Sequence, residues 1–265
     1  MKTLIIGKNS FIGKSAYYNI NNAEKISYQD IDKTNLKEYN VILNCSIMDD
    51  YKNSAYSEDR DIDIKLARIA EQENMHYVMI STRKVYGISN SLLVRYNENS
   101  KTNPSDRYSE NKLITEYKIK ELMDSYTILR PSNVFGYEPG RKSFMGFCMN
   151  QLRDTNKIVY DVSANTVRDF IHVDTFTKVL NRICQLKAKG LYNIGSNIGL
   201  SVGNVSKYLI QGYGSGDLVA DSDKLFDQFI LDNTKINSEL GINIGIIDFE
   251  KTIIELGKKL YEDRK

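Results

Sequence analysis

A short apolar run that ends in glycine opens the chain and constrains its fold more than any other segment. Leu4, Ile5 and Ile6 precede Gly7, and residues 12–18 then carry apolar side chains at helical spacing. This order predicts a strand, a tight turn and a helix, which is half of a βαβ unit. Further strands are expected at residues 25–28, 41–44, 76–81, 127–129 and 191–194, and helices at 60–73, 108–123, 174–187 and 249–261. Their alternation predicts an α/β fold with a doubly wound parallel sheet covered by helices.

The chain changes character near Val134. Gly, Arg and aromatic residues gather from there to Tyr160, and glycines recur at positions 212, 214 and 216. We interpret the first stretch as a ligand-facing cap and the second as loops. The predicted division is a sheet domain of residues 1–133 plus 172–196 and a smaller C-terminal substrate-binding region of residues 134–171 plus 197–265.

Composition excludes several classes of protein. The 265 residues are 41% apolar and 26% charged, and 36 Lys and Arg against 34 Asp and Glu give a net charge of +2. Nucleic acid and anionic membranes are therefore poor candidates as partners. Cys45, Cys148 and Cys184 form no CxxC pair, so we expect reduced thiols in a cytoplasmic protein, with neither a disulfide framework nor a metal site. No segment has the length of a membrane helix.

The turn between the first strand and the first helix is a candidate for binding a dinucleotide. Gly7 and Gly13 frame it with the spacing G-x-x-S-x-x-G, and Ser10 occupies the middle position. Backbone N–H groups at the start of a helix can hold a pyrophosphate. The same spacing also occurs in ordinary strand-to-helix turns, so this motif alone leaves both interpretations open.

Tyr108 and Lys112 lie four residues apart, and hence on one face of the expected helix. A cation close to a phenol favours its phenolate, so the pair could serve as an acid or base. This motif is weak alone, since Tyr261 and Lys265 repeat it. The ordered set is more specific, because Thr82 follows an expected strand and could place a hydroxyl near Tyr108.

Taken in order, these motifs resemble the extended short-chain dehydrogenase/reductase family, the NAD-dependent epimerases, dehydratases and reductases of nucleotide sugars, over nearly the whole chain. The resemblance implies a Rossmann-type fold, an NAD or NADP cofactor and a nucleotide-diphosphate sugar as ligand. It implies catalytic roles for Thr82, Tyr108 and Lys112. The residues implied to contact the cofactor are Gly7, Asn9, Ser10, Phe11, Ile12, Gly13, Asp30, Ile31, Asn44, Cys45, Ser46, Tyr108, Lys112 and Pro131. Those implied to contact the sugar nucleotide are Tyr86, Asn133, Arg141, Ser143, Phe144 and Arg168, of which Arg168 would clamp the diphosphate.

Several of these residues also have purely structural interpretations. Asp30 could be a surface turn residue or a helix cap, and Arg168 could form an ion pair with Asp169. Neither histidine is assigned a role, and Tyr86 could simply pack. The pair of aspartates at positions 49 and 50 is expected in a solvated loop.

Two positions after Thr82 separate members of the family. Its dehydratases use an Asp-Glu pair there, whereas this chain has Arg83 and Lys84, which cannot donate and abstract a proton as carboxyl groups do. The short span between Gly13 and Asp30 is similar to small 4-keto sugar reductases, such as dTDP-4-dehydrorhamnose reductases. We therefore expect reduction of a nucleotide-linked 4-keto-6-deoxyhexose, in the synthesis of surface polysaccharide sugars. A 4-epimerase and a catalytically idle nucleotide-binding protein of the same fold are the alternatives. The choice of NAD or NADP stays open, and the resemblance also suggests a homodimer through residues 60–73 and 108–123.

Overall fold

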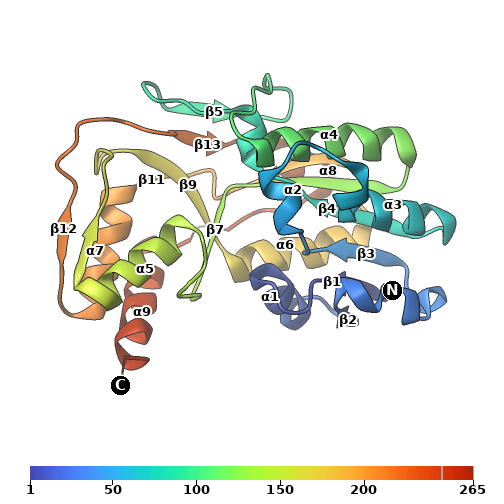
Figure 1. Cartoon of the computed structure of the whole chain (residues 1–265), viewed down its shortest axis with the longest axis horizontal. Coiled ribbons are helices and arrows are strands. Elements are labelled where there is room, and N and C mark those ends of the chain that lie inside the picture. The colour runs from blue at the N-terminus through green and yellow to red at the C-terminus, as the bar shows by residue number, and fades with distance from the viewer. Residues whose placement is uncertain (246, 265) are drawn as a thin grey trace.

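Six parallel strands form the central sheet in a computed structural model, which describes residues 1–245 and 247–264 (Figure 1). Their spatial order is β10 (Gly190–Ile194), β6 (Tyr126–Pro131), β4 (His76–Ile80), β3 (Val41–Asn44), β1 (Thr3–Ile6) and β2 (Ala23–Ile26). Every neighbouring pair is parallel. The chain runs outward from β1 to β2 and then returns to the other side of β1. This reversal creates the crevice beyond the strand ends in which doubly wound proteins bind ligands.

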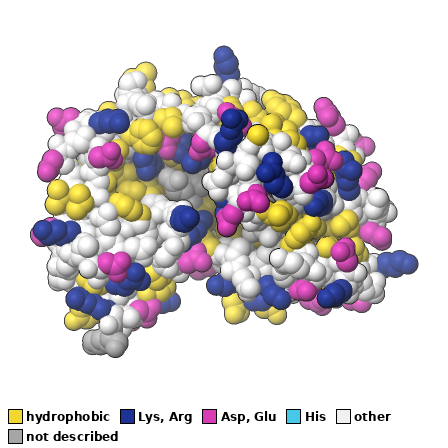
Figure 2. All heavy atoms as spheres, viewed as in Figure 1, with side chains coloured by type: hydrophobic (Ala, Val, Ile, Leu, Met, Phe, Trp, Pro, Cys, Tyr) yellow, Lys and Arg dark blue, Asp and Glu magenta, His cyan; other side chains and the backbone are white. Residues whose placement is uncertain are grey.

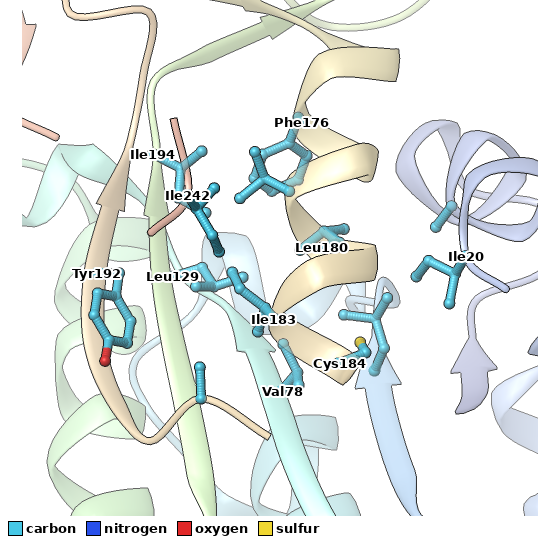
Figure 3. Packing of buried hydrophobic residues seen from close by; sticks show 14 of the residues in the cluster. Ile20, Val78, Leu129, Phe176, Leu180, Ile183, Cys184, Tyr192, Ile194 and Ile242 are labelled. Atoms are coloured by element: carbon cyan, nitrogen blue, oxygen red, sulfur yellow. The ribbon is translucent and has the colours of Figure 1, made fainter. Parts of the chain in front are cut away.

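Helices cover both faces of this sheet. One face carries α1 (Phe11–Asn19) and α6 (Val173–Leu186), and the other carries α3 (Ile62–Gln72) and α4 (Arg107–Leu122). Figure 3 shows Phe176, Leu180 and Ile183 of α6 directed at the strands, among them Leu129 and Ile194. The doubly wound, Rossmann-type sheet that the sequence predicts is thus confirmed.

Capping residues explain where these helices begin. The Ser10 hydroxyl accepts the N–H of Gly13 at the start of α1, and the Asp61 carboxylate accepts the N–H groups of Asp63 and Ile64 at the start of α3. Asp106 and Ser109 form a reciprocal capping box at the start of α4. Each side chain satisfies N–H groups that a helix leaves unpaired in its first turn.

The remaining elements form the second part of the molecule. Strands β11 (Gly199–Ser201), β9 (Val167–His172), β13 (Phe229–Leu231) and β5 (Val94–Tyr96) lie side by side, β7 (Asn133–Phe135) pairs with β9, and β8 (Lys157–Val159) pairs with β12 (Asp217–Val219). Helices α5 (Phe144–Thr155), α7 (Val202–Tyr213) and α9 (Phe249–Glu262) share a separate core. The short helices are α2 (Asp49–Asn53) and α8 (Thr234–Leu240), and 3-10 turns lie at η1 (Tyr28–Lys33), η2 (Leu36–Glu38), η3 (Glu58–Arg60) and η4 (Arg83–Tyr86).

Two expectations for this second part are wrong. Residues 202–213 form helix α7 rather than a glycine-rich loop, because Gly212 lies within the helix and Gly214 ends it in the left-handed conformation. The stretch after Val134 is expected to be a ligand-facing cap rather than sheet, but it contains the strands β7 and β8 beside helix α5; its residues Arg141, Ser143 and Phe144 do line a cavity. The division into two domains stays a prediction, and β5 crosses it by pairing with β13.

Candidate functional site

A cavity of about 610 Å³ lies beyond the ends of β4 and β6, between the central sheet and the start of α5. The surface in Figure 2 is hollowed between the two parts of the molecule, with Lys and Arg side chains at the margin of the hollow. Nine residues that the sequence predicts for the site line this cavity. They are Ile12, Thr82, Tyr108, Pro131, Asn133, Arg141, Ser143, Phe144 and Arg168.

The cavity is strongly cationic. Among the described residues that line it, the Lys and Arg side chains are Arg83, Lys84, Arg141, Lys142 and Arg168, and the acidic side chain is Asp227. The whole chain carries a net charge of only +2, so positive charge is concentrated here. A cleft of this kind attracts an anionic ligand such as a diphosphate.

Arg168 presents a donor that no described residue satisfies. Its Nη2 donates to the Phe226 carbonyl at 3.1 Å, while its Nε is buried without a partner in the described part of the chain. Burial lowers the pKa of its guanidinium, so an anion beside it would be stabilising. Asn133 Nδ2 and Ser132 Oγ are also buried and unpartnered. Since buried polar groups are normally satisfied, these three atoms fit a cavity that takes a polar ligand.

The suggested ion pair between Arg168 and Asp169 does not form. Asp169 instead accepts the backbone N–H and the hydroxyl of Ser196, each at 2.8 Å, and the N–H of Leu231 at 3.1 Å. Adjacent residues of a strand point to opposite faces of the sheet, which separates the two side chains. Arg168 is consequently free of a carboxylate from its own strand.

The turn after β4 carries Thr82 and the two cations that replace the dehydratase acids. Thr82 is the N-cap residue of η4, and its hydroxyl accepts the N–H of Lys84 at 3.2 Å. Arg83 Nη1 donates to Asp227 at 2.6 Å, a second bond joins Arg83 Nη2 to the same carboxylate, and the guanidinium lies 4.0 Å from the centre of the Phe229 ring. Lys84 forms an exposed ion pair with Asp106 at 2.8 Å. The one carboxylate on the described cavity wall is therefore already bound to Arg83.

Tyr108 and Lys112 occupy successive turns of α4 but have different surroundings. Tyr108 is half-buried in the first turn and lines the cavity, whereas Lys112 is 3% exposed and does not. Lys112 Nζ donates to Asp63 of α3 at 2.8 Å. Burial is the largest single influence and lowers the pKa of the lysine. The charge of Asp63, its hydrogen bond, and the nearby Tyr108 and Asp61 together outweigh burial, so the net effect is a raised pKa.

A second cavity of about 300 Å³ adjoins the glycine turn. Its lining includes Gly7, Asn9, Ser10, Cys45 and Ser46, all predicted to contact the cofactor, and also Lys8, Ser27, Tyr28, Gln29 and Ile47. Gly7 has a φ of +101°, which a residue with a side chain rarely adopts. A Cβ at Gly13 would lie 2.3 Å from the Gly7 carbonyl oxygen, so only glycine lets α1 start this close to β1. The loops after β1 and β3 meet here, and the turn and first helical N–H groups fit the pyrophosphate of a dinucleotide.

The remaining predicted residues line neither cavity. Asp30 pairs with Lys8 at 3.4 Å on the surface, and Ile31 is buried in the core. Asn44 donates to Asp63, and the Tyr86 hydroxyl donates to Asn193 at 2.7 Å. Gly13 is buried within α1, and the Phe11 ring lies 4.3 Å from the Arg141 guanidinium. Of these residues, Asp30, Asn44 and Phe11 contact side chains or backbone groups that do line a cavity, at Lys8, Ser46 and Arg141.

Sequence reasoning missed several residues of the site. Ser81, Ser132, Lys142 and Asp227 line the larger cavity, and Asp63 holds Lys112. Asp63 carried a signal, because an acidic residue on the apolar side of an expected helix calls for a buried partner. Asp227 carried none, since its partner Arg83 lies 144 positions earlier.

Other features assign no further chemistry. Asp49 pairs with Lys52, and no group of side chains that could hold a metal is found among residues 1–245 and 247–264. The three cysteines are free. No helix in the described part of the chain is long and apolar enough to cross a membrane.

Comparison with known proteins places this geometry in a family. The human dTDP-D-glucose 4,6-dehydratase is 29% identical over 143 residues, which are 51% of this chain and 39% of that protein. The chain thus spans about two fifths of the length of such relatives.

Two solved structures share the whole fold. The UDP-N-acetylglucosamine 4-epimerase of Methanobrevibacter ruminantium has a TM-score of 0.82 at 15% identity, covering 99% of this chain and 98% of its own. A dTDP-4-dehydrorhamnose reductase of Clostridium acetobutylicum has a TM-score of 0.78 at 18% identity, covering 98% of this chain and 99% of its own.

A family profile matches more than half of the sequence. The match runs over residues 33–195, from the connection after β2 through the end of β10, and so includes Thr82, Tyr108, Lys112 and Arg168. Its description is the NAD dependent epimerase/dehydratase family, whose members are nucleotide-sugar enzymes with an NAD(P) cofactor. The protein therefore belongs to the NAD-dependent epimerase/dehydratase family.

Proposed function

We propose that this protein is an NAD(P)-dependent reductase of a nucleotide-linked 4-keto-6-deoxyhexose. The observation that carries this proposal is a cationic cavity that both Thr82 and Tyr108 line, and in which the one carboxylate on the described wall, Asp227, is bound to Arg83. A reductase needs a hydride donor, a proton donor and an anchor for the nucleotide. A dehydratase needs in addition a free carboxylic acid and a carboxylate, which this wall does not offer.

The proton would come from Tyr108. The Tyr108 phenol would give its proton to the carbonyl oxygen of the sugar, so that the ketone becomes an alcohol. A bound nicotinamide would supply the hydride for the carbonyl carbon. Thr82, which is 8% exposed at the cavity wall, would donate a hydrogen bond to the same oxygen. Lys112 lies one helical turn from Tyr108 on α4 and would orient the ribose of the cofactor.

The cations of the cavity would bind the nucleotide diphosphate. Arg168 has a free buried Nε, and its guanidinium lies 5.6 Å from the centre of the Phe144 ring. Arg141 is held over Phe11 and donates to the Val134 carbonyl at 2.7 Å. Phe144 offers a ring on which a base could stack, and Asn133 offers its unpartnered amide to the sugar. The small connection between β2 and β3, made of the turns η1 and η2, also agrees with a small reductase.

The test is a turnover assay with purified protein. Absorbance of the reduced nicotinamide is followed with NADPH or NADH and a panel of dTDP-, UDP-, GDP- and CDP-linked 4-keto-6-deoxysugars. We expect steady loss of the reduced cofactor with at least one sugar, which would also identify the base and the cofactor. Interconversion of 4-epimers with no net cofactor loss would show an epimerase, and binding of nucleotide without any turnover would show an idle fold.

A further inference from the structure

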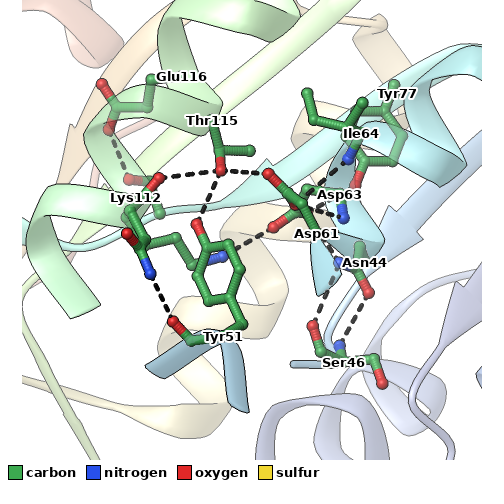
Figure 4. Close-up of polar contacts among 12 residues, drawn as sticks. Asn44, Ser46, Tyr51, Asp61, Asp63, Ile64, Tyr77, Lys112, Thr115 and Glu116 are labelled. Carbon is green, nitrogen blue, oxygen red and sulfur yellow. Dashed lines mark hydrogen bonds and ion pairs between the residues drawn. The ribbon is translucent and has the colours of Figure 1, made fainter. Parts of the chain in front are cut away.

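Lys112 is the most deeply buried cation of the proposed site, and α3 supplies its partner. The side chains of Lys112 and Asp63 are 4% and 5% exposed, and the ammonium lies 2.8 Å from Asp63 Oδ2. Figure 4 shows the lysine reaching from α4 across to this carboxylate. A lysine whose ammonium was exposed to a cofactor cleft could be solvated there and would not need a buried carboxylate as its partner.

Two further bonds fix the carboxylate itself. Asp63 Oδ1 accepts from Asn44 Nδ2 at 2.7 Å and from the Tyr77 hydroxyl at 2.6 Å, so both oxygens have partners (Figure 4). Asn44 ends strand β3, and its Oδ1 accepts the N–H of Ser46, which lines the smaller cavity. The position of Asp63 in the first turn of α3 also favours a negative charge there. Asp63 thus connects the lysine of α4 to the loop beside the smaller cavity.

The charge of the lysine depends on this neighbour. Burial alone would lower the pKa of Lys112 and favour the neutral amine, and Asp63 is the largest influence acting in the opposite direction. The other titratable groups around Lys112 are Asp61 of α3, Tyr108 of its own helix, and Tyr51, whose ring centre lies 5.6 Å away. Asp61 is occupied by Thr115 at 2.6 Å and by Tyr56 at 3.0 Å.

Resting on the proposed function, we propose that Asp63 is a positioning residue of the site: it keeps the Lys112 ammonium charged and fixed behind Tyr108. Asp63→Asn keeps a side-chain oxygen that can accept from Asn44 and Tyr77, so the effect of that variant on the reaction passes through the lysine. Removal of the carboxylate leaves a buried cation without a partner, which is strongly unfavourable, and the lysine responds by losing its proton near neutral pH. The loss of cofactor binding in such a variant should therefore depend on pH, whereas a loss caused by disturbed packing should not.

The experiment compares cofactor binding in the wild type and in Asp63→Asn. The Kd of NADPH and of NADH is measured by nicotinamide fluorescence between about pH 6 and 9, alongside kcat and KM on the substrate found above. We expect a nearly constant Kd for the wild type. For Asp63→Asn we expect a Kd raised by roughly tenfold or more at pH 9 that recovers toward pH 6, where Lys112 regains its proton.

Two variants separate this role from a structural one. Asp61→Asn makes the same change two residues earlier, at a carboxylate that is bound to Thr115 and Tyr56 rather than to the lysine, and should show a much smaller pH dependence. In the background of Lys112→Met, Asp63→Asn should change neither Kd nor kcat further, because the residue through which it acts is already absent. The double variant Lys112→Met with Asp63→Asn carries no unpaired buried charge. It can therefore still be compared with Lys112→Met if Asp63→Asn alone does not fold.

The outcomes are distinct. A wild type that binds neither nicotinamide nucleotide overturns the proposed function together with this inference. The positioning role alone is overturned if the wild type binds a nicotinamide nucleotide and the Kd of Asp63→Asn is either normal or raised by the same factor at every pH. The positioning role is also overturned if adding Asp63→Asn to Lys112→Met raises the Kd or lowers kcat by a further factor of more than about three.

Discussion

At the scale of single residues, proton transfer and charge binding are assigned to different side chains. Tyr108 lines the cavity and carries the hydroxyl proposed to donate a proton, and Arg168, which lines the same cavity, has an unpartnered buried N–H. Removal of the Tyr108 hydroxyl should therefore lower kcat, whereas removal of the Arg168 guanidinium should raise the KM for the nucleotide sugar.

The first prediction concerns Tyr108. Tyr108→Phe keeps the ring but removes the proton donor, so kcat should fall by about 10²- to 10⁴-fold while the Kd of the cofactor is retained. Tyr117→Phe is the matched control on the same helix, since Tyr117 is 54% exposed. Turnover of the Tyr108 variant close to that of the control would exclude Tyr108 as the acid.

The second prediction concerns Arg168. Arg168→Ala should raise the KM for the nucleotide sugar by roughly 10- to 100-fold with a smaller change in kcat, because a hydrogen bond to a charged group contributes about 1.5–3 kcal/mol. Arg182→Ala, an exposed arginine of α6, should leave the KM unchanged. An unaltered KM for Arg168→Ala would contradict the diphosphate clamp.

A third prediction concerns His76, which is buried and neutral at the start of β4. Its Nε2 lies 2.7 Å from Thr127 Oγ1, and burial lowers its pKa from 6.5 to about 4. The unfolded chain therefore binds more protons than the folded protein between these pH values, and stability falls as the pH falls through that window. The loss should reach about 3 kcal/mol at pH 4.

The measurement is urea unfolding of the wild type and of His76→Gln from pH 7 to pH 4. Burial raises the pKa of Asp169 to about 6, which acts in the opposite direction, so the difference between the two proteins isolates the histidine. Parallel curves of unfolding free energy against pH would contradict the prediction.

At the scale of elements, glycine determines how closely α7 and α9 pack. A Cβ at Gly257 would lie 2.3 Å from the Leu209 carbonyl oxygen, and one at Gly212 would lie 2.0 Å from that of Ile254. Both helices therefore touch through their backbones, in the core where Leu209 and Ile253 are buried.

Gly257→Ala should consequently destabilise the protein by about 1–3 kcal/mol, although alanine is the better helix former. Gly245→Ala is the control, because a Cβ there meets nothing within 4 Å. The urea midpoint of each variant is compared with that of the wild type. A stabilised Gly257 variant would show that the two helices can separate without cost.

The elements of the central sheet could be predicted from the sequence, because each has a strong local signal. Strand β3 was predicted with its observed ends, and α1, α3, α4, α6 and α9 within two residues. Helix α7 was not, since the glycines at its end and just after it are typical of loops. Packing against α9 explains the glycine at position 212, where a Cβ would meet the Ile254 backbone.

At the scale of the whole molecule, charge is distributed unevenly. Five Lys and Arg side chains and one Asp line the larger cavity in the described structure, in a chain of net charge +2. An increase in salt from about 0.05 to 0.3 M should therefore raise the KM for the nucleotide sugar severalfold and change kcat little. A KM that is independent of salt in steady-state assays would contradict this prediction. The KM of Arg168→Ala should depend on salt less strongly than that of the wild type.

The site itself was only partly accessible from sequence. Thr82, Tyr108 and Arg168 belong to recognisable motifs, and the structure brings them to one cavity. Asp63 and Asp227 act through partners 49 and 144 positions away. The apolar surroundings of Asp63 in the sequence indicate that it needs a partner, but no local pattern identifies that partner, and none marks Asp227. The homodimer through α3 and α4 stays a prediction.

The ion pair between Arg83 and Asp227 also has a consequence for biosynthesis. It joins residues separated by 144 positions, so the substrate wall can close only after the ribosome has made most of the chain. The glycine turn and the loop after β3, in contrast, lie within the first 47 residues. The nascent protein thus contains every residue of the smaller cavity early and completes the wall of the larger cavity late, and a truncation before Asp227 would leave Arg83 without its carboxylate partner in the cavity.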